Sequence, residues 1–225
     1  MDRAELDLSD VRAVSSYFES RRPDAVVLCA AKVGGVAAHA AGQYSMLHDN
    51  LAIQNAVIDS SYRNGVSRLL FVSSGTVYPS VCEQPIPESA MFTGPFDPLH
   101  ESYALAKITG MKLCEKIRTE SGRDFFSLVP TNMYGEGDTF EDGRSNVVCS
   151  LLKRFFEARN AGNSEVVVWG TGNALRDFLY VDDMADAILH FLDNPPEASY
   201  LNIGSDQEVS ISNLAKSIGY LVGYE

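Results

Sequence analysis

A serine, a tyrosine and a lysine are spaced so that together they could reduce a ketone. Tyr103 and Lys107 lie four residues apart in SYALAK, so on a helix both side chains project from one face. Ser74 follows the apolar run LLFV, at the expected end of a strand. A lysine beside a tyrosine favours the phenolate, so we expect a lowered pKa for Tyr103. The set offers a proton donor, a cation and a hydroxyl for the carbonyl oxygen, whereas the hydride must come from a cofactor.

Each part of this set also has an ordinary structural explanation. The stretch Ser73-Ser74-Gly75-Thr76 within FVSSGTVYPS is a common way to turn a chain after a strand. Tyrosine and lysine at this spacing also occur on many solvated helices. The choice therefore depends on the elements that carry these residues.

Apolar runs alternate with helical patterns along the chain, which predicts an α/β fold with a doubly wound, mostly parallel sheet. Ser9 is the expected N-terminal cap of the first helix, and Gly65 is the residue at which the second helix is expected to end. Asp182 and Asp183 are expected to cap a helix N-terminus and not to form a catalytic pair. The expected strands are 24–30, 68–73, 124–130, 166–169 and 200–203, and the expected helices are 10–21, 49–64, 101–121, 147–161, 182–192 and 212–222.

Three loops follow the first three of these strands, at 31–42, 73–99 and 131–145. In a parallel sheet the carboxyl ends of the strands meet at one edge, where ligands bind. The stretches 80–99 and 131–145 are longer than ordinary connections, which favours functional loops. We therefore expect the three loops to converge on one site.

The composition limits the classes of partner. The chain has 225 residues, 45% of them hydrophobic, and a formal net charge of -12, which argues against general nucleic-acid binding. No apolar run approaches the roughly 20 residues of a membrane span, and the N-terminus has no signal-peptide character. The four cysteines show no CxxC pair, so we expect reduced thiols in a cytoplasmic protein and no metal site; Cys29, Cys114 and Cys149 should pack inside.

Five motifs, in order along the chain, carry a resemblance to a known family. They are AAKVGG (30–35), YALAKITGMKLCE (103–115), PTNMYG (130–135), VVVWGTG (166–172) and RDFLYVDDMA (176–185). The chain resembles the GDP-L-fucose synthases of the extended short-chain dehydrogenase/reductase (NAD-dependent epimerase/dehydratase) family. The resemblance implies a Rossmann-like fold with a small C-terminal substrate lobe, NADP(H), a GDP-linked 4-keto-6-deoxy sugar as substrate, and a homodimer through helices 49–64 and 101–121.

The resemblance also implies roles for individual residues. Ser74, Tyr103 and Lys107 are similar to the family's catalytic triad. A planar cation at Arg176 suits the GDP diphosphate. Trp169 is expected either to contact the nucleotide sugar or to pack as an aromatic in the core. The implied cofactor residues are Ala30, Ala31, Lys32, Tyr103, Lys107, Pro130, Thr131 and Asn132, and the implied substrate residues are Thr76, Asn146, Lys153, Trp169 and Arg176.

The family's glycine-rich GxxGxxG turn does not occur in the sequence. By the resemblance, residues 1–135 form an NADP-binding core without its first strand and helix, and residues 136–225 combine the nucleotide-sugar lobe with the last core elements. The chain thus resembles a family member truncated at both ends. Because the turn binds the cofactor pyrophosphate, we expect these 225 residues alone to bind NADPH weakly.

A second departure concerns epimerisation, which the family assigns to a cysteine and a histidine. Thr76 and Asn146 stand at those positions, and neither side chain titrates near neutrality. We therefore expect reduction without epimerisation at C3 or C5. Cys82 and His100 lie in a neighbouring loop and are the alternatives, whereas His39 and His48 are expected at the surface, and His190 there or in ordinary packing.

Two other functions remain open at this point. One is a nucleotide-sugar 4-epimerase of the same family, which keeps NAD bound. The other is a non-catalytic remnant that binds a nucleotide sugar or a partner subunit. The intact trio Ser74, Tyr103 and Lys107 favours an enzyme over the remnant.

Overall fold

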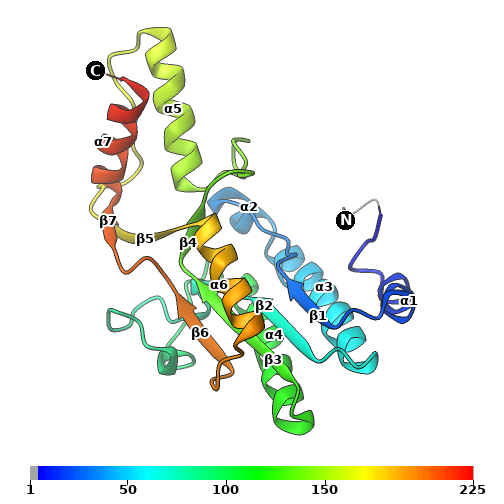
Figure 1. The fold of residues 1–225 in the computed structure, drawn as a ribbon. Coiled ribbons are helices and arrows are strands. Elements are labelled where there is room, and N and C mark those ends of the chain that lie inside the picture. The colour runs from blue at the N-terminus through cyan, green and yellow to red at the C-terminus, as the bar shows by residue number, and fades with distance from the viewer. Residues whose placement is uncertain (1–4, 225) are drawn as a thin grey trace.

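The structure, a computed structural model, describes residues 5–224. Its main sheet has four parallel strands in the order β1-β2-β3-β6, with α1, α3 and α4 on one face and α6 on the other (Figure 1). The predicted doubly wound α/β fold is confirmed. The elements are α1 (Val11–Arg21), β1 (Ala25–Leu28), α3 (Gln43–Arg63), β2 (Arg68–Val72), α4 (Glu101–Ser121), β3 (Asp124–Pro130), α6 (Val181–Asp193) and β6 (Tyr200–Ile203).

The two central strands are apolar on both faces, which explains why they read as continuous apolar runs. Phe71 and Phe125 belong to the core beneath α3 and α4, whereas their neighbours Leu70 and Phe126 belong to the core beneath α6. Successive side chains of a strand point to opposite faces, so each strand serves both cores. The sheet is thereby fixed from both sides, together with the edge that carries the site.

A smaller lobe lies at the upper end of the molecule in Figure 1. There α5 (Val147–Ala161) packs against α7 (Ile211–Val222) through a separate core that contains Phe155 and Ile218. A second sheet joins the lobe to the main body in the order β4-β5-β7, from β4 (Asn132–Tyr134), β5 (Leu175–Tyr180) and β7 (Glu208–Ser210). β4 pairs parallel and β7 antiparallel with β5.

The loops after β1, β2 and β3 emerge at one edge of the parallel sheet, as predicted. They contain the short elements α2 (Val36–Ala41), η1 (Gly75–Val77) and η2 (Glu88–Ala90). A Cβ at Gly35 would lie 3.0 Å from the carbonyl oxygen of Gly143, so the first and third loops meet in a close contact that a glycine favours. This contact brings the lobe-side loop over the sheet edge.

Several local predictions were wrong. Asp10, not Ser9, caps α1 and accepts hydrogen bonds from Arg12 N and Ala13 N. Asp182 and Asp183 lie in the first turn of α6, where they suit the helix dipole, but the cap position is Tyr180. The helix predicted at 49–64 already begins at Gln43, the expected strand 166–169 does not form, and β4, β5 and β7 were not anticipated.

Residues 5–224 include no helix that is both long enough and apolar enough to cross a membrane.

Candidate active site

Ser74 lies at the carboxyl end of β2, where its side chain has a defined hydrogen-bonding state. Its Oγ accepts hydrogen bonds from the backbone N of Thr76 at 3.4 Å and from Thr76 Oγ1 at 3.2 Å. Because its acceptor sites are used, the Ser74 proton is free to be donated to a ligand. Ser73 instead donates to Met111 Sδ at 3.0 Å in the core. Within Ser73-Ser74-Gly75-Thr76, the Ser73 hydroxyl thus has a structural role in the core, whereas the Ser74 hydroxyl is available for a ligand.

Lys107 is buried at the foot of the site, with 3% of its surface exposed. Its Nζ donates to the carbonyl oxygen of Val72 at 2.8 Å and lies 4.7 Å from the ring centroid of Phe71 and 5.7 Å from that of Tyr103. Burial lowers the pKa of Lys107 to about 8, and nearby Cys29 opposes this shift. The ammonium is therefore fixed between the end of β2 and the tyrosine.

Tyr103 is also buried, and here a prediction was wrong. Burial raises the pKa of Tyr103 to about 12, whereas we expected Lys107 to lower it. The cost of placing a phenolate away from water outweighs the cation, whose Nζ bonds to Val72 O. In this state Tyr103 is a protonated phenol, ready to act as a donor.

The approach of α4 to the sheet sets the position of both residues. A Cβ at Gly110 would lie 2.6 Å from Cζ of Phe71, so only glycine lets the helix pack this closely on β2. Next to this contact, Gln54 Nε2 donates to the carbonyl oxygen of Ala106 at 2.7 Å and ties α4 to α3. The tyrosine and lysine therefore stand on a helix held from two directions.

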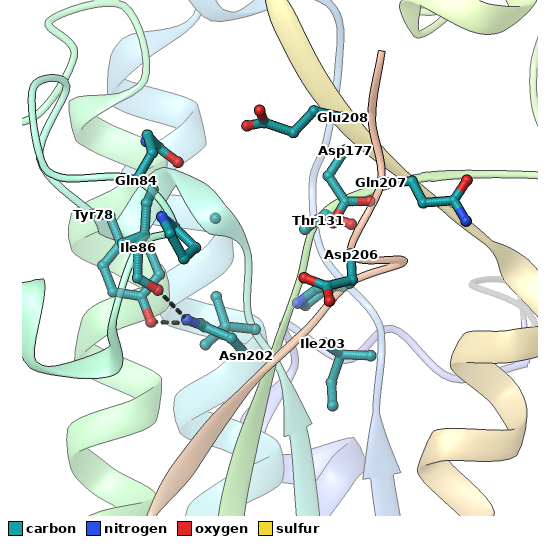
Figure 2. Close-up of a pocket in the computed structure, with 15 residues that line it drawn as sticks. Tyr78, Gln84, Ile86, Thr131, Asp177, Asn202, Ile203, Asp206, Gln207 and Glu208 are labelled. Atoms are coloured by element: carbon teal, nitrogen blue, oxygen red, sulfur yellow. Dashed lines mark hydrogen bonds between the residues drawn. The ribbon is translucent and has the colours of Figure 1, made fainter.

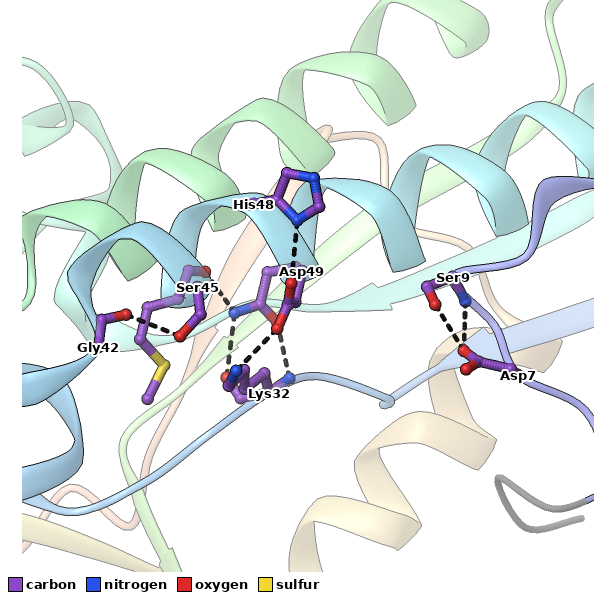
Figure 3. Close-up of polar contacts among 9 residues, drawn as sticks. Asp7, Ser9, Lys32, Gly42, Ser45, His48 and Asp49 are labelled. Atoms are coloured by element: carbon purple, nitrogen blue, oxygen red, sulfur yellow. Dashed lines mark hydrogen bonds and ion pairs between the residues drawn. The ribbon is translucent and has the colours of Figure 1, made fainter.

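A cavity of about 560 Å³ contains the first group of implied cofactor residues, Ala30, Ala31 and Lys32. Lys32 Nζ forms an ion pair with Asp49 Oδ2 at 2.7 Å (Figure 3). The hydrogen bond from His48, followed by that from Lys32, lowers the pKa of Asp49. Leu6, Asp7, Leu8, Ser9, Ala52 and Ile53 complete the wall.

Asn50 supports this cavity and was missed in the sequence. Its Oδ1 accepts from the backbone N of Lys32 at 2.8 Å, and its Nδ2 donates to the carbonyl oxygens of Lys32 at 3.0 Å and Met46 at 2.7 Å. A buried asparagine inside a helix has a poor helix propensity, and this is the signal that could have identified it. It fixes the loop after β1 to α3.

Pro130 and Thr131, from the second group of implied cofactor residues, line a different cavity of about 630 Å³ (Figure 2). Tyr78 Oη donates to Asn202 Oδ1 at 2.5 Å on its opposite wall. Asn132 donates through Nδ2 to the carbonyl oxygen of Asp177 at 3.2 Å. The structure thus separates the two groups between cavities, and the cofactor role of the second group stays a prediction.

A third cavity, of about 420 Å³, lies between the lobe and the loop after β1. Asn146, Lys153 and Trp169 line it, together with Gly35. Trp169 is 75% exposed, so the core alternative for it is wrong. The guanidinium of Arg154 lies 4.3 Å from the ring centroid of Trp169, an arrangement that makes a flat cationic surface. Sequence reasoning missed Arg154, since nothing local sets it apart from Lys153.

Asn146 and Lys153 are both engaged with this protein's own groups. The Asn146 Oδ1 accepts from Cys149 N at 3.0 Å and caps α5, while its Nδ2 donates to Asp138 Oδ2 and to Met133 O. Lys153 Nζ pairs with Asp142 Oδ1 at 2.8 Å. A ligand in this cavity must displace these partners or bind alongside them.

Arg176 does not line the cavity that contains Trp169. It lies on β5, opposite Val209 of β7, and its Nη1 donates to the carbonyl oxygen of Leu175 at 2.7 Å. Its predicted contact with a diphosphate therefore stays a prediction, and Arg154 is the cation that the structure places beside the tryptophan.

Two expectations about burial were wrong. Cys29 is exposed, whereas Cys114 and Cys149 are buried as expected. His39 is 6% exposed, although it was expected at the surface. A histidine in a short helix gives no periodic signal, and the rings of His100 and Tyr103 that contact it are distant in sequence.

The sequence profile of the NAD dependent epimerase/dehydratase family matches residues 2–204. The chain belongs to this family. The Rossmann-like parallel sheet lies within the matched residues, and the catalytic roles of Ser74, Tyr103 and Lys107 stay a prediction.

Named relatives and solved structures narrow the comparison. The chain is 47% identical to GDP-L-fucose synthase 1 of Arabidopsis thaliana over 99% of its length and 69% of that protein. It is 41% identical to the GDP-L-fucose synthase of Escherichia coli (strain K12) over 99% of its length and 72% of that protein. A GDP-mannoheptose C4 reductase of Campylobacter jejuni with NADP bound superposes with a TM-score of 0.90 at 29% identity, covering 100% of this chain and 77% of that one.

Proposed function

We propose that this epimerase/dehydratase family member uses NADPH to reduce the 4-keto group of a GDP-linked 4-keto-6-deoxy sugar. The observation that carries the proposal is the arrangement at the end of β2. There the free proton of Ser74, the buried phenol of Tyr103 and the ammonium of Lys107 belong to one edge of the sheet. The relatives named GDP-L-fucose synthase and the GDP-mannoheptose C4 reductase structure support the substrate class.

The residues of the chain take separate roles in this reduction. Ser74 donates a hydrogen bond to the 4-keto oxygen and polarises the carbonyl. Tyr103 gives its proton to that oxygen as the carbonyl carbon is reduced. A phenol with a pKa of about 12 holds its proton at neutral pH, so it enters the reaction in the donor form. Lys107 offers positive charge to the phenolate that remains.

The cavity at Ala30, Ala31 and Lys32 is the proposed site of the NADPH. Its two alanines leave open volume beside the sheet edge, and Lys32 supplies a cation that can exchange Asp49 for a phosphate group. When bound, NADPH supplies the hydride that no protein side chain can provide.

The substrate's nucleotide is assigned to the cavity at Trp169. The indole face and the Arg154 guanidinium suit a purine base or a diphosphate, respectively. This assignment also gives a role to the side chain of Trp169, which is 75% exposed.

The proposed reaction excludes epimerisation at C3 and C5. Moving a proton next to the ketone needs a group that titrates near neutrality, whereas Thr76 donates its hydroxyl to Ser74 and Asn146 caps α5. Running the reduction in deuterated water tests this. We expect no deuterium at C3 or C5 of the product, and its incorporation there would contradict the proposal.

Substrate choice can be tested directly. The protein is assayed with GDP-4-keto-6-deoxymannose and with NADPH in large excess, because weak binding of this cofactor is expected, and UDP-glucose with NAD is the contrasting pair. We expect NADPH oxidation with the first pair and no change at C4 with the second. Conversion of UDP-glucose to its C4 epimer would favour the 4-epimerase instead.

A homodimer through α3 and α4 and a location in the cytoplasm complete the proposal. Tyr62 of α3 and Leu105 of α4 are exposed, which supports a further contact on this helix pair. Unbridged cysteines fit a reducing compartment. Light scattering at the outlet of a sizing column should give twice the mass of the chain, and a single-chain mass would refute the dimer.

A further inference from the structure

Two histidines and an aspartate outside the proposed trio form a row of contacts that ends at Tyr103. The ring of His39, in α2, meets the ring of Tyr103 edge-on with centroids 5.6 Å apart. The ring of His100, just before α4, meets His39 with centroids 4.7 Å apart. His100 Nδ1 and Asp97 Oδ2 are 3.1 Å apart. A continuous row of side chains therefore runs from the partly exposed Asp97 to the buried Tyr103.

His39 is poorly placed to carry a charge. Among the described residues its buried Nδ1 has no hydrogen-bond partner, so an added proton there would have no acceptor. Burial, and next the neighbouring His100, lower the pKa of His39, while Asp97 opposes the shift. His39 is therefore neutral at pH 7.

The other segments packed on α2 do not change this picture. α3 carries His48 and Asp49, which bond to each other, and Asp49 also binds Lys32. The loop that meets Gly35 carries charged groups that are paired within the lobe; these are Asp142 with Lys153 and Arg144 with Glu141. The charged or titratable groups that act on His39 are thus His100, Asp97 and the Tyr103 phenol.

We propose that His39 and His100 are positioning residues for the reduction, which hold the Tyr103 ring in its donor orientation while the His39 imidazole is neutral. This rests on the proposed function, because it deepens the role of Tyr103. Edge-on ring contacts are directional, so the pair restricts the tilt of the phenol. A proton added to His39 must be buried without an acceptor, so charging His39 separates its ring from Tyr103 and releases the phenol.

The kinetic consequence is a dependence of kcat on pH. Protonation of His39 lowers kcat as pH falls, whereas the KM of the GDP sugar changes little, because neither histidine lines the cavity at Trp169. Displacing a reacting group by about 1 Å costs about 100-fold in rate. The pair is therefore expected to contribute a loss of this order when it is removed.

The test compares the wild-type protein with His39→Phe and His39→Ala between pH 5.5 and 8. Phenylalanine keeps a ring against Tyr103 but cannot take up a proton, so we expect the acid limb of kcat to disappear. Alanine removes the ring contact, so kcat should fall by about 10- to 100-fold at every pH with KM within about twofold. His190→Phe, in α6 and remote from the site, is the matched control and should leave the profile unchanged.

Two results would overturn the proposal. One is an acid limb in His39→Phe that superimposes on that of the wild type, which means that packing alone matters. The other is wild-type kcat in His39→Ala. If His39→Phe does not fold, His100→Asn takes its place, because removal of His100 should move the acid limb toward higher pH.

A second measurement needs no turnover. Imidazole Cε1 resonances of histidine-labelled protein are followed by NMR during a pH titration of the wild type and His100→Asn. Loss of His100 should raise the pKa of His39, and an unchanged His39 titration overturns the pair. If that coupling is present while the wild type reduces no GDP sugar, the pairing of the histidines is upheld and the proposed function is the part that fails.

Discussion

The catalytic trio and the cavity at Trp169 are built on opposite principles. Tyr103 and Lys107 are 8% and 3% exposed and stand on a helix wedged between α3 and the sheet, whereas Trp169 is 75% exposed and stands on a segment without regular structure. Groups that must meet a reacting atom within a fraction of an ångström are fixed by the core. Groups that grip the remote part of a ligand lie on a rim that can adapt to it.

The largest expected effect is loss of the proton donor. Tyr103→Phe keeps the ring contacts but removes the hydroxyl, so kcat should fall by about 10³- to 10⁴-fold while the KM of the GDP sugar stays within about threefold. Tyr62→Phe on α3 is the control. Steady-state kinetics with NADPH decide the matter, and a loss expressed mainly in KM would show that the buried region also serves in binding.

Removal of the Ser74 hydroxyl should be the next largest effect. Ser74→Ala takes away one donor to the carbonyl oxygen, which typically costs about 100-fold in kcat. Ser73→Ala, one residue earlier, is the matched control, because that hydroxyl faces Met111 in the core. Equal losses in the two variants would mean that the turn, and not the Ser74 donor, matters.

Burial of the Lys107 ammonium is expected to lower the folding stability of the protein. Its folded pKa of about 8 lies below the unfolded value of 10.5, so the stability present above pH 10.5 is lost as pH falls to 8. That pKa shift corresponds to about 3 kcal/mol of lost folding stability. Replacing Lys107 removes this cost but also removes its hydrogen bond to Val72 O, which contributes about 1 kcal/mol. The free energy of unfolding of Lys107→Met at pH 7 should therefore be about 2 kcal/mol higher than that of the wild type, although the variant should be inactive.

Urea unfolding at pH 7 measures this change, with Lys112→Met on the exposed side of α4 as the control. In the wild type the same titration should reduce kcat as pH rises through about 8, because the ammonium loses its proton. A destabilised Lys107→Met protein would show that the hydrogen bond to Val72 outweighs the burial of the charge.

The smallest effect is expected at the rim. Trp169→Ala should raise the KM of the GDP sugar about tenfold and leave kcat within about twofold, since the indole binds a part of the substrate that does not react. Phe156→Ala is the control, because Phe156 also lies near an arginine, Arg159, but does not line the cavity. A fall in kcat for Trp169→Ala would erase the contrast between the two regions.

The contrast also explains which predictions from the sequence succeeded. Helix 101–121 was predicted at its observed bounds because its apolar spacing is local. The strand expected at 166–169 does not form, because its apolar residues Val166 and Val168 pack beside the core between α5 and α7 instead of pairing with a strand. β5 and β7 were missed because they pair with each other across a long separation in sequence.

The sequence by itself determined the alternating elements, the sheet edge at which the loops meet, and the spacing that puts Tyr103 and Lys107 on one helix face. These follow from periodicity, which is a local property. Only the tertiary structure decided that Tyr103 holds its proton, that Thr76 orients Ser74, and that His39 is buried against the tyrosine. Burial and long-range contacts set the charge and direction of a side chain, and they arise when the helices close on the sheet.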